Sequence, residues 1–554
     1  MREQTTMTMY AYLFEAKSIQ NYILDSGRMR DLIGASELVD SLTEELLPDA
    51  LTHLGYEQEN PIRFSRRAGG ALYAFCENKN ALDRFAALWS LLVAQYAPGL
   101  VFDVGHSEGN DAKSAFDKAR ESLRENTSRV RPNLPVAAPI AERSRRTGNP
   151  GTKFEVEQDT RRKQAIDLPT KRKQDFYEEI KKKERKTGLI QRFSPDKANL
   201  SANDWPRDLT PDADGAFPYL GDDHTVALIH ADGNGMGELL RRAGDAVKDK
   251  PDQYISIFRK LSEAIARITQ TAAQHATETV LILERTLCRK NGHPNQRLAA
   301  RPIVLGGDDL TILVRADLAL PFLQAFLEKF EDESERRLPE LQIGAQRLTA
   351  GAGVVFLRYS QPFYLASALA ESLARLAKDR AKAEDSQNPP STLAFHRVTQ
   401  SMIEDYPEIV RREKTVSIRG EDYINTLGAY ALRPGLGIPA LDDLFELQGL
   451  LQREDMSRGP TRQLQTLMGQ APNQAATAYR RWRTLMKENQ SNELEQFDNY
   501  IASLLNHYQP DSRLPYAQNE TDSECACHSP IGDALTLMAI AKHHAADTEQ
   551  EAAA

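Results

Sequence analysis

Residues 306–309 read Gly-Gly-Asp-Asp, and apolar runs lie directly on both sides of them, at 303–305 and 310–314. Two short β-type runs joined through glycines predict a β-hairpin, with Asp308 and Asp309 at its tip. Adjacent carboxylates at the end of a buried hairpin repel each other, and a divalent cation would relieve that repulsion. These four residues alone are equally compatible with an ordinary acidic turn.

A second acidic site precedes the hairpin in the chain. Residues 226–231 form a nearly continuous apolar run, typical of a strand buried on both faces, and this run ends in Asp232. The glycine-rich turn at 233–237 and the helical pattern after it suit a phosphate, because free N–H groups point out of such a turn. If the strand and the hairpin are antiparallel neighbours in one sheet, Asp308 and Asp309 meet Asp232 at one edge. Three carboxylates there suit Mg²⁺, which prefers hard oxygen ligands and leaves room for phosphates.

The two acidic motifs, at 232–237 and 306–309, resemble the second palm domain of the large polymerase-cyclase subunit of type III CRISPR effector complexes. That palm is related to GGDEF nucleotide cyclases. The family usually has an acidic residue where Asn234 stands, so one metal ligand is missing and full two-metal activity is in question. Three later segments follow the element order of that palm: 348–356, 361–382 and 392–396.

The resemblance implies a nucleotidyltransferase that joins ATP into 3′–5′ linked, cyclic oligoadenylate as a second messenger in antiviral defence. It implies Mg²⁺ as the cofactor, with Mn²⁺ as an alternative, and attack of a 3′-hydroxyl on an α-phosphate. The implied catalytic and metal-binding residues are Asp232, Asp308 and Asp309. The implied nucleotide-binding residues are Gly233, Asn234, Gly235, Gly237, Gly306, Gly307, Lys378, Lys382 and Ser36.

The lysines and the serine also have plainer interpretations. Lys378 and Lys382 are one helical turn apart and are slightly more typical of a basic surface face, although the family places a lysine near here against phosphates. Ser36 lies in a segment, 28–39, that resembles a first-palm helix whose serine faces bound nucleotide. A plain helix serine is the more common case.

An internal repeat organises the chain. The first half has strand-like segments near 9–14, 69–75 and 100–104, with helical patterns between them, in the same order as the second half. Ala71 and Leu72 stand where the second copy has its aspartates. We therefore predict an α+β fold with two ferredoxin-like palm domains, the first of them degenerate, in which helices cover one face of each sheet. The predicted divisions are a first palm at 1–120, a basic insertion at 121–220, a second palm at 221–400 and a C-terminal α-helical domain at 401–554.

Composition narrows the class of protein. The net charge of −9 argues against a surface that wraps nucleic acid throughout. The stretch 161–192 is nevertheless rich in lysine and arginine, and we interpret it as a solvated insertion, with contact to an RNA backbone as the alternative. No apolar run approaches the roughly 18 residues of a membrane span, and no signal peptide is recognisable, so we expect a cytoplasmic protein with no membrane partner.

The four cysteines are too few for a disulfide framework. Cys525, Cys527 and His528 could bind a metal with Cys288 or His293, but the spacing is not that of a zinc knuckle, and structural zinc is not expected.

Rival interpretations remain for the partners. The expected partners are ATP, RNA and RNA-guided CRISPR effector subunits. One rival is a catalytically weak scaffold subunit whose palms only bind nucleotide, and another is a free-standing cyclase. The family's zinc element and its histidine-aspartate nuclease domain have no counterpart in this sequence, which favours the free-standing version and argues against DNA cleavage.

Overall fold

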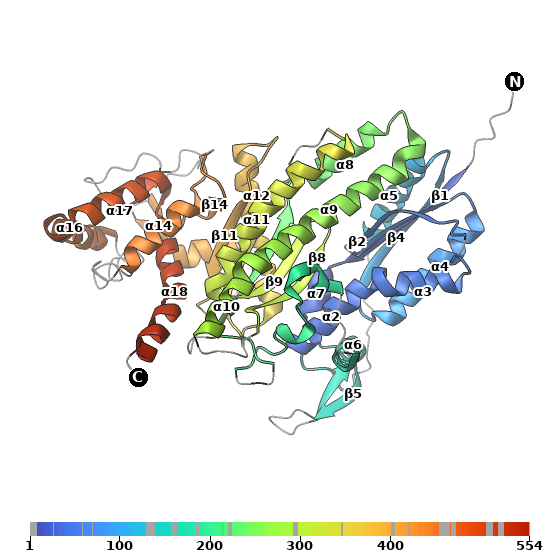
Figure 1. Ribbon diagram of the computed structural model, residues 1–554, viewed down its shortest axis with the longest axis horizontal. Coiled ribbons are helices and arrows are strands. Elements are labelled where there is room, and N and C mark those ends of the chain that lie inside the picture. The colour runs from blue at the N-terminus through green and yellow to red at the C-terminus, as the bar shows by residue number, and fades with distance from the viewer. Residues whose placement is uncertain are drawn as a thin grey trace.

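Two α/β units lie next to each other in the computed structural model, and a largely helical C-terminal region follows them (Figure 1). The structure describes residues 8–25, 27–57, 59–68, 70–128, 139–156, 163–183, 188–211, 213, 215–219, 224–291, 297–344, 347–399, 405–418, 421–435, 437–453, 466, 472–505, 514–518 and 526–552. No helix in this described part is long and apolar enough to cross a membrane.

The first unit is a four-stranded antiparallel sheet in the order β2-β3-β1-β4. Its strands are β1 (Met9–Lys17), β2 (Arg63–Ala68), β3 (Ala71–Cys76) and β4 (Val101–Gly109). Its helices are α1 (Ile19–Leu24), α2 (Met29–Ser41), α3 (Leu47–His53), α4 (Lys79–Tyr96) and α5 (Ala112–Ser128). Alternate side chains of β1 enter cores on opposite faces of the sheet, Tyr12 on one face and Leu13 on the other.

The second unit is a six-stranded sheet in the order β14-β11-β10-β7-β9-β8. Its strands are β7 (Thr225–Gly233), β8 (Ala300–Gly306), β9 (Asp309–Arg315), β10 (Ala350–Arg358), β11 (Thr392–Arg397) and β14 (Ala429–Ala431). Its helices are α8 (Met236–Ala246), α9 (Tyr254–Ala276), α10 (Leu283–Lys290), α11 (Ala319–Arg337) and α12 (Phe363–Glu384). The four strands β8-β9-β7-β10 repeat the strand order of the first unit, so the predicted repeat is visible in the topology.

Helices cover both faces of the second sheet. Helices α9 and α11 share one core with Ile229 and Ile312, whereas α12 shares another with Leu228 and Leu313. The prediction of a single helix-covered face is therefore wrong for this unit, while the prediction of a doubly buried β7 is confirmed. The core beneath α12 also contains residues of the first unit, such as Phe14, so the two units are joined by one continuous core.

The two hairpins show how the repeat aligns. The last paired residues are Ala68 with Ala71 in the first unit and Gly306 with Asp309 in the second. Ala71 therefore corresponds to Asp309. The alignment predicted from the glycines, which set Ala71 against Asp308, is wrong by one residue because it matched residue types rather than paired positions.

The first unit does have a carboxylate at the position of Asp232. Phe14 pairs with the second residue of β3, and Ala231 pairs with the second residue of β9. The next residues along each strand are Glu15 and Asp232, so these two carboxylates occupy equivalent places in the two units.

The segment between the units contains a β-hairpin and a helix that were not predicted as separate elements. Strands β5 (Gly151–Val156) and β6 (Lys163–Asp167) form a small sheet, and α6 (Leu168–Lys183) packs on α2. Lys173 is fully buried and its ammonium donates to the carbonyl of Tyr22 at 2.5 Å. The prediction of a wholly solvated insertion is therefore wrong for this part, although Lys181 and Lys182 are exposed.

The C-terminal region contains helices, as predicted, and several short strands that were not predicted; the helix expected at 461–468 lies outside the described residues except for residue 466. The helices are α14 (Leu441–Gln452), α16 (Pro472–Asn489), α17 (Ser491–Leu504) and α18 (Ile531–Ala552). The strands, in the sheet order β12-β13-β16-β15, are β12 (Thr415–Ile418), β13 (Glu421–Ile424), β16 (Ala526–His528) and β15 (Ala517–Gln518). An all-helical reading beyond residue 400 is thus too simple, since β14 also returns to the second sheet.

Candidate functional site

The hairpin β8–β9 carries the Gly-Gly-Asp-Asp motif at its tip, as predicted. Gly307 has φ of 64°, a conformation that favours glycine in a two-residue hairpin loop. The hydroxyl of Thr269, on α9, donates to the carbonyl of Gly307 at 2.6 Å. The tip is therefore held against a helix rather than left free in solvent.

Three carboxylates converge at this tip. Strand β7 pairs antiparallel with β9, and the register ends with Ala231 opposite Leu310, directly beside Asp232 and Asp309. One ligand oxygen from each of Asp232, Asp308 and Asp309 lies within 4.8 Å of the other two. The structure thus brings together the three residues that the sequence predicted as one cluster, each of them partly buried.

The carboxylates of this cluster do not share one charge state. Burial, with the charge of Asp232, raises the pKa of Asp308 to about 6. Burial, a hydrogen bond to Asp232 and the charge of Asp308 raise the pKa of Asp309 well above its ordinary value. Burial alone would raise the pKa of Asp232, but the hydrogen bond from Asp309 and the charge of Lys378 lower it. The raised pKa values of Asp308 and Asp309 reflect the cost of keeping several negative charges together in a buried place.

Lys378 reaches the cluster because α12 lies directly on β10. Gly351 pairs with Asp232, and a Cβ at Gly351 would come within 2.3 Å of the Lys378 Cγ. The Lys378 ammonium contacts the Asp232 carboxylate and donates to the carbonyl of Gly233 at 3.1 Å. Lys382, one turn further, is exposed and lines neither of the cavities described below. Of the two predicted lysines, the structure brings only Lys378 to the site.

These residues fit a hard divalent cation. Three carboxylates supply oxygen ligands, and one ammonium already stands in as a counter-charge against Asp232. The pKa of Asp308 and that of Asp309 stay raised despite this lysine, so one ammonium does not balance the cluster. A divalent ion with oxygen preference would balance it better. In the part of the chain that the structure describes, this is the sole group of three or more His, Cys, Asp or Glu residues close enough for a metal. Cys525 and His293 lie outside the described residues.

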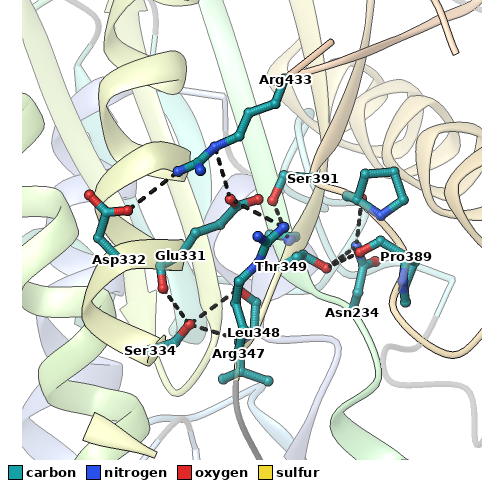
Figure 2. A network of polar contacts seen from close by, with 12 residues as sticks. Asn234, Glu331, Asp332, Ser334, Arg347, Leu348, Thr349, Pro389, Ser391 and Arg433 are labelled. Carbon is teal, nitrogen blue, oxygen red and sulfur yellow. Dashed lines mark hydrogen bonds and ion pairs between the residues drawn. The ribbon is translucent and has the colours of Figure 1, made fainter. Parts of the chain in front are cut away.

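Asn234 lies against Thr349 and the segment before β11 (Figure 2). Its backbone N–H donates to the carbonyl of Thr349 at 2.7 Å, and its Nδ2 donates to the Thr349 hydroxyl at 3.0 Å and to the carbonyl of Pro390 at 3.4 Å. The side chain is 4% exposed. Asn234 was predicted to bind nucleotide, but the structure places it as an anchor between the glycine-rich turn and the start of β10.

The anchor belongs to a longer polar network (Figure 2). The hydroxyl of Thr349 donates to Pro389, and the hydroxyl of Ser391 accepts from the N–H that follows Thr349 on β10. Buried Glu331 on α11 pairs with Arg347 and Arg433, each at 3.4 Å. The network therefore connects the glycine-rich turn to β10, β11 and the segment after β14.

Helix α8 begins at Met236, two residues earlier than predicted, and its first turn faces a cavity. Gly235 precedes it with φ of 71°, and Gly237 lines the cavity. The N–H groups of a helix's first turn have no partner within the helix and attract anions. This arrangement supports the predicted phosphate-binding turn.

Two cavities flank the hairpin tip. Cavity A has about 500 Å³ and is lined by Asp308 and Gly307 together with residues of β2, β3, α5, α8 and α9. Cavity B has about 490 Å³ and is lined by Asp309, Gly306 and Gly307 together with residues of α1, α2, α7 (Gly188–Phe193) and α9. Each cavity has walls from both units, and both volumes fall within the range of small-molecule sites.

Ser36 lies in cavity B, as its predicted role requires. It is 4% exposed, and its Oγ is buried without a hydrogen-bond partner in the described structure. Helix α9 forms a wall of both cavities through Ser262 and Ile265 on one side and Ala266 and Thr269 on the other.

Helix α9 and two arginines near the end of β2, Arg66 and Arg67, line the cavities but were not predicted. The apolar residues of α9 recur at helical spacing, which would have revealed it: Ile255, Phe258, Leu261, Ile265, Ile268 and Ala272. The arginines carry no comparable local signal.

A comparison with models of known protein families supports the prediction made for the second unit. Residues 225–388 match the family model described as Cas10/Cmr2, second palm domain. The resemblance inferred from the two acidic motifs is thereby confirmed for this segment. A comparison with curated proteins finds no match.

Several solved structures are similar over most of the chain. Csm1 in T.onnurineus has a TM-score of 0.43 and 14% identity, covering 89% of this chain and 65% of that one. The Csm1–Csm4 cassette in complex with cA4 has a TM-score of 0.41, with 12% identity over 87% of this chain and 65% of that one. The same cassette in complex with one ATP has a TM-score of 0.42, with 13% identity over 88% and 66%. The chain thus spans about two thirds of the length of these relatives.

Proposed function

We propose that this chain, whose residues 225–388 match the Cas10/Cmr2 second palm domain, is a Mg²⁺-dependent nucleotidyltransferase that joins ATP into cyclic oligoadenylate. The observation that carries the proposal is the convergence of Asp232, Asp308 and Asp309 at a hairpin tip between two cavities of similar volume. Two reactant nucleotides need two such cavities, with the reacting atoms near the shared tip.

The residues of the site would have three separate roles. Asp232, Asp308 and Asp309 would hold Mg²⁺, which when bound activates a hydroxyl and neutralises phosphate charge. The first turn of α8, with Gly237, would bind phosphates in cavity A. Ser36 would contact a nucleotide in cavity B, so that the two reactants approach from opposite sides of the hairpin.

The first unit would be a palm that lacks most metal ligands. Its strand order repeats that of the second unit, but Ala71 stands at the position of Asp309. It would therefore bind and orient nucleotide without a metal of its own. Adenine as the base, ring closure, antiviral signalling and RNA-guided partner subunits follow from the family resemblance and are part of the proposal.

A second candidate function is a nucleotide-binding scaffold subunit with weak or absent catalysis. Asn234 favours it, because an amide that donates to Thr349 stands at a position that is usually acidic in the family. Product formation separates the two candidates.

Asp308→Ala combined with Asp309→Ala should abolish oligoadenylate formation from ATP, with a fall on the order of a hundredfold or more, because metal-held charge stabilisation is worth several kcal/mol. Chromatography of the products with Mg²⁺ present measures it. Asp249→Ala combined with Asp252→Ala is the matched control, since both residues are exposed and line neither cavity. Wild-type turnover in the first double variant would refute the assignment, and a wild-type protein that binds ATP without making product would favour the scaffold.

A further inference from the structure

Two consecutive arginines, Arg66 and Arg67, lie near the end of β2 and line different cavities. Arg66 lines cavity A, and Arg67 lines cavity B. Successive side chains of a strand point to opposite faces, which explains the division. The first unit therefore sends one cation toward each side of the hairpin tip of the second unit.

Arg66 lies against that tip. A Cβ at Gly307 would stand 3.9 Å from the Arg66 Nη2. The guanidinium also lies 5.8 Å from the centre of the Tyr73 ring, a distance that allows a cation–π contact. In the described part of the chain, no hydrogen bond or ion pair engages it, so its donors are available for a ligand.

Most other charges around cavity A are paired with each other. Glu15 accepts from Lys17 at 2.7 Å and from the hydroxyl of Tyr73 at 2.5 Å. Lys113 pairs with Asp117 at 2.7 Å, and Arg241 pairs with Glu238 at 2.6 Å. Besides Arg66, the lining cation without an ion pair in the described structure is Arg120, which is exposed. Arg66 is thus the partly buried cation that faces Asp308.

Part of the wall of cavity A is aromatic. Tyr254 and Phe258 have ring centroids 4.4 Å apart, and Phe116 lies 5.6 Å from Tyr254. A ligand that fills the cavity would place a flat apolar group among these rings and an anionic group between Arg66, the first turn of α8 and Asp308. A nucleotide with several phosphates has both parts.

We propose that Arg66 binds the triphosphate of the nucleotide in cavity A, so that the first unit completes the site whose carboxylates belong to the second. The inference rests on the proposed function for the identity of the nucleotide. A planar guanidinium can bind two phosphate oxygens at once, and its charge complements the triphosphate once metal ions balance the carboxylates. Arg66 is then a substrate-binding residue supplied across the interface between the units.

The test is calorimetric titration of the full chain with α,β-methylene-ATP and, separately, with AMP, both with Mg²⁺. Arg66→Ala should weaken binding of the triphosphate roughly tenfold to a hundredfold and leave AMP affinity within about twofold, because one charge-assisted contact is lost. Arg66→Lys should retain part of the affinity. Arg63→Ala is the matched control, since Arg63 is on the same strand but pairs with Glu77 at 3.1 Å outside the cavity.

The outcomes separate this inference from the proposed function. Unchanged triphosphate affinity in Arg66→Ala, or an equal loss for AMP and the triphosphate, overturns the inference, because the residue would then be dispensable or merely structural. A wild-type chain that binds the triphosphate through Arg66 but forms no oligoadenylate overturns the proposed function alone. A wild-type chain that binds neither nucleotide overturns both. Circular dichroism and thermal midpoints verify that each variant is folded.

Discussion

Asn234 has a structural role that its place in the sequence motif does not indicate. By its place in the motif, it is a lost metal ligand. In the structure, its amide group donates to Thr349 and Pro390, and its position in the turn is held by a backbone bond to Thr349. A carboxylate cannot donate these bonds. The residue therefore contributes to the shape of the glycine-rich turn rather than to the charge of the site.

Asn234→Asp should consequently destabilise the protein by about 1–3 kcal/mol without raising its affinity for Mg²⁺, because a buried carboxylate would face the Pro390 carbonyl. Urea unfolding followed by circular dichroism measures the first effect, and calorimetric Mg²⁺ titration measures the second. Tighter Mg²⁺ binding by the variant would show that this position still reaches the metal site.

At the scale of elements, the contact between α12 and β10 places the cation of the site. Gly351 and Gly353 lie on the face of β10 that α12 covers. A Cβ at Gly353 would stand 2.0 Å from the carbonyl oxygen of Ala370 on α12. Backbone atoms of the helix thus occupy the space of a missing side chain, and this close approach brings Lys378 to Asp232.

Gly353→Ala should push α12 away from the sheet. We expect a loss of about 1–3 kcal/mol in unfolding free energy, as for other overpacked cores, and weaker nucleotide binding through the displaced Lys378. Unfolding curves and calorimetric titration with ATP and Mg²⁺ measure these effects. Gly449→Ala on α14, where nothing lies within 4 Å, is the control: it should leave nucleotide binding unchanged and raise the unfolding free energy by about 0.5–1 kcal/mol, because alanine favours a helix interior. A variant as stable as the wild type would mean that the helix is not constrained there.

Local patterns account for the elements that were predicted and for those that were not. The hairpin with its two aspartates and the strand before Asp232 have strong apolar runs and glycine turns, so they could be predicted. Strands such as β15 and β16, with two and three residues, are too short to show a period of two. The contact between Lys378 and Asp232 could not be predicted, because it depends on helix packing at Gly351, which no local pattern reports.

For the whole molecule, a buried ion pair and a shared core join the two units. Glu37 on α2 faces Arg301 on β8 at 3.8 Å, and both are about 3% exposed. The strand order that the two units share was predictable from the order of elements along the chain. The composite cavities were not, because Arg66 and Ser36 approach the hairpin only through the packing of residues more than 200 positions apart.

Glu37→Ala should leave the Arg301 charge buried and unpaired, which costs about 3–5 kcal/mol. Because the core is continuous, we expect both units to lose stability in one calorimetric transition that moves to lower temperature. Glu77→Ala, which breaks the exposed pair with Arg63, should cost at most about 1 kcal/mol. Splitting into two transitions, only one of them shifted, would show that the units unfold independently.

The walls shared by both cavities also matter while the chain is being made. Domains generally fold in order as a ribosome releases them, and the first sheet with its helices is complete at Ser128. Neither cavity can form until α9 and β9 have left the ribosome, because the second unit supplies one wall of each cavity. Cellular nucleotide therefore cannot stabilise the nascent first sheet through these pockets, since a ligand stabilises only a state that binds it. During that interval, the surface around Ser36 must remain soluble without its later cover.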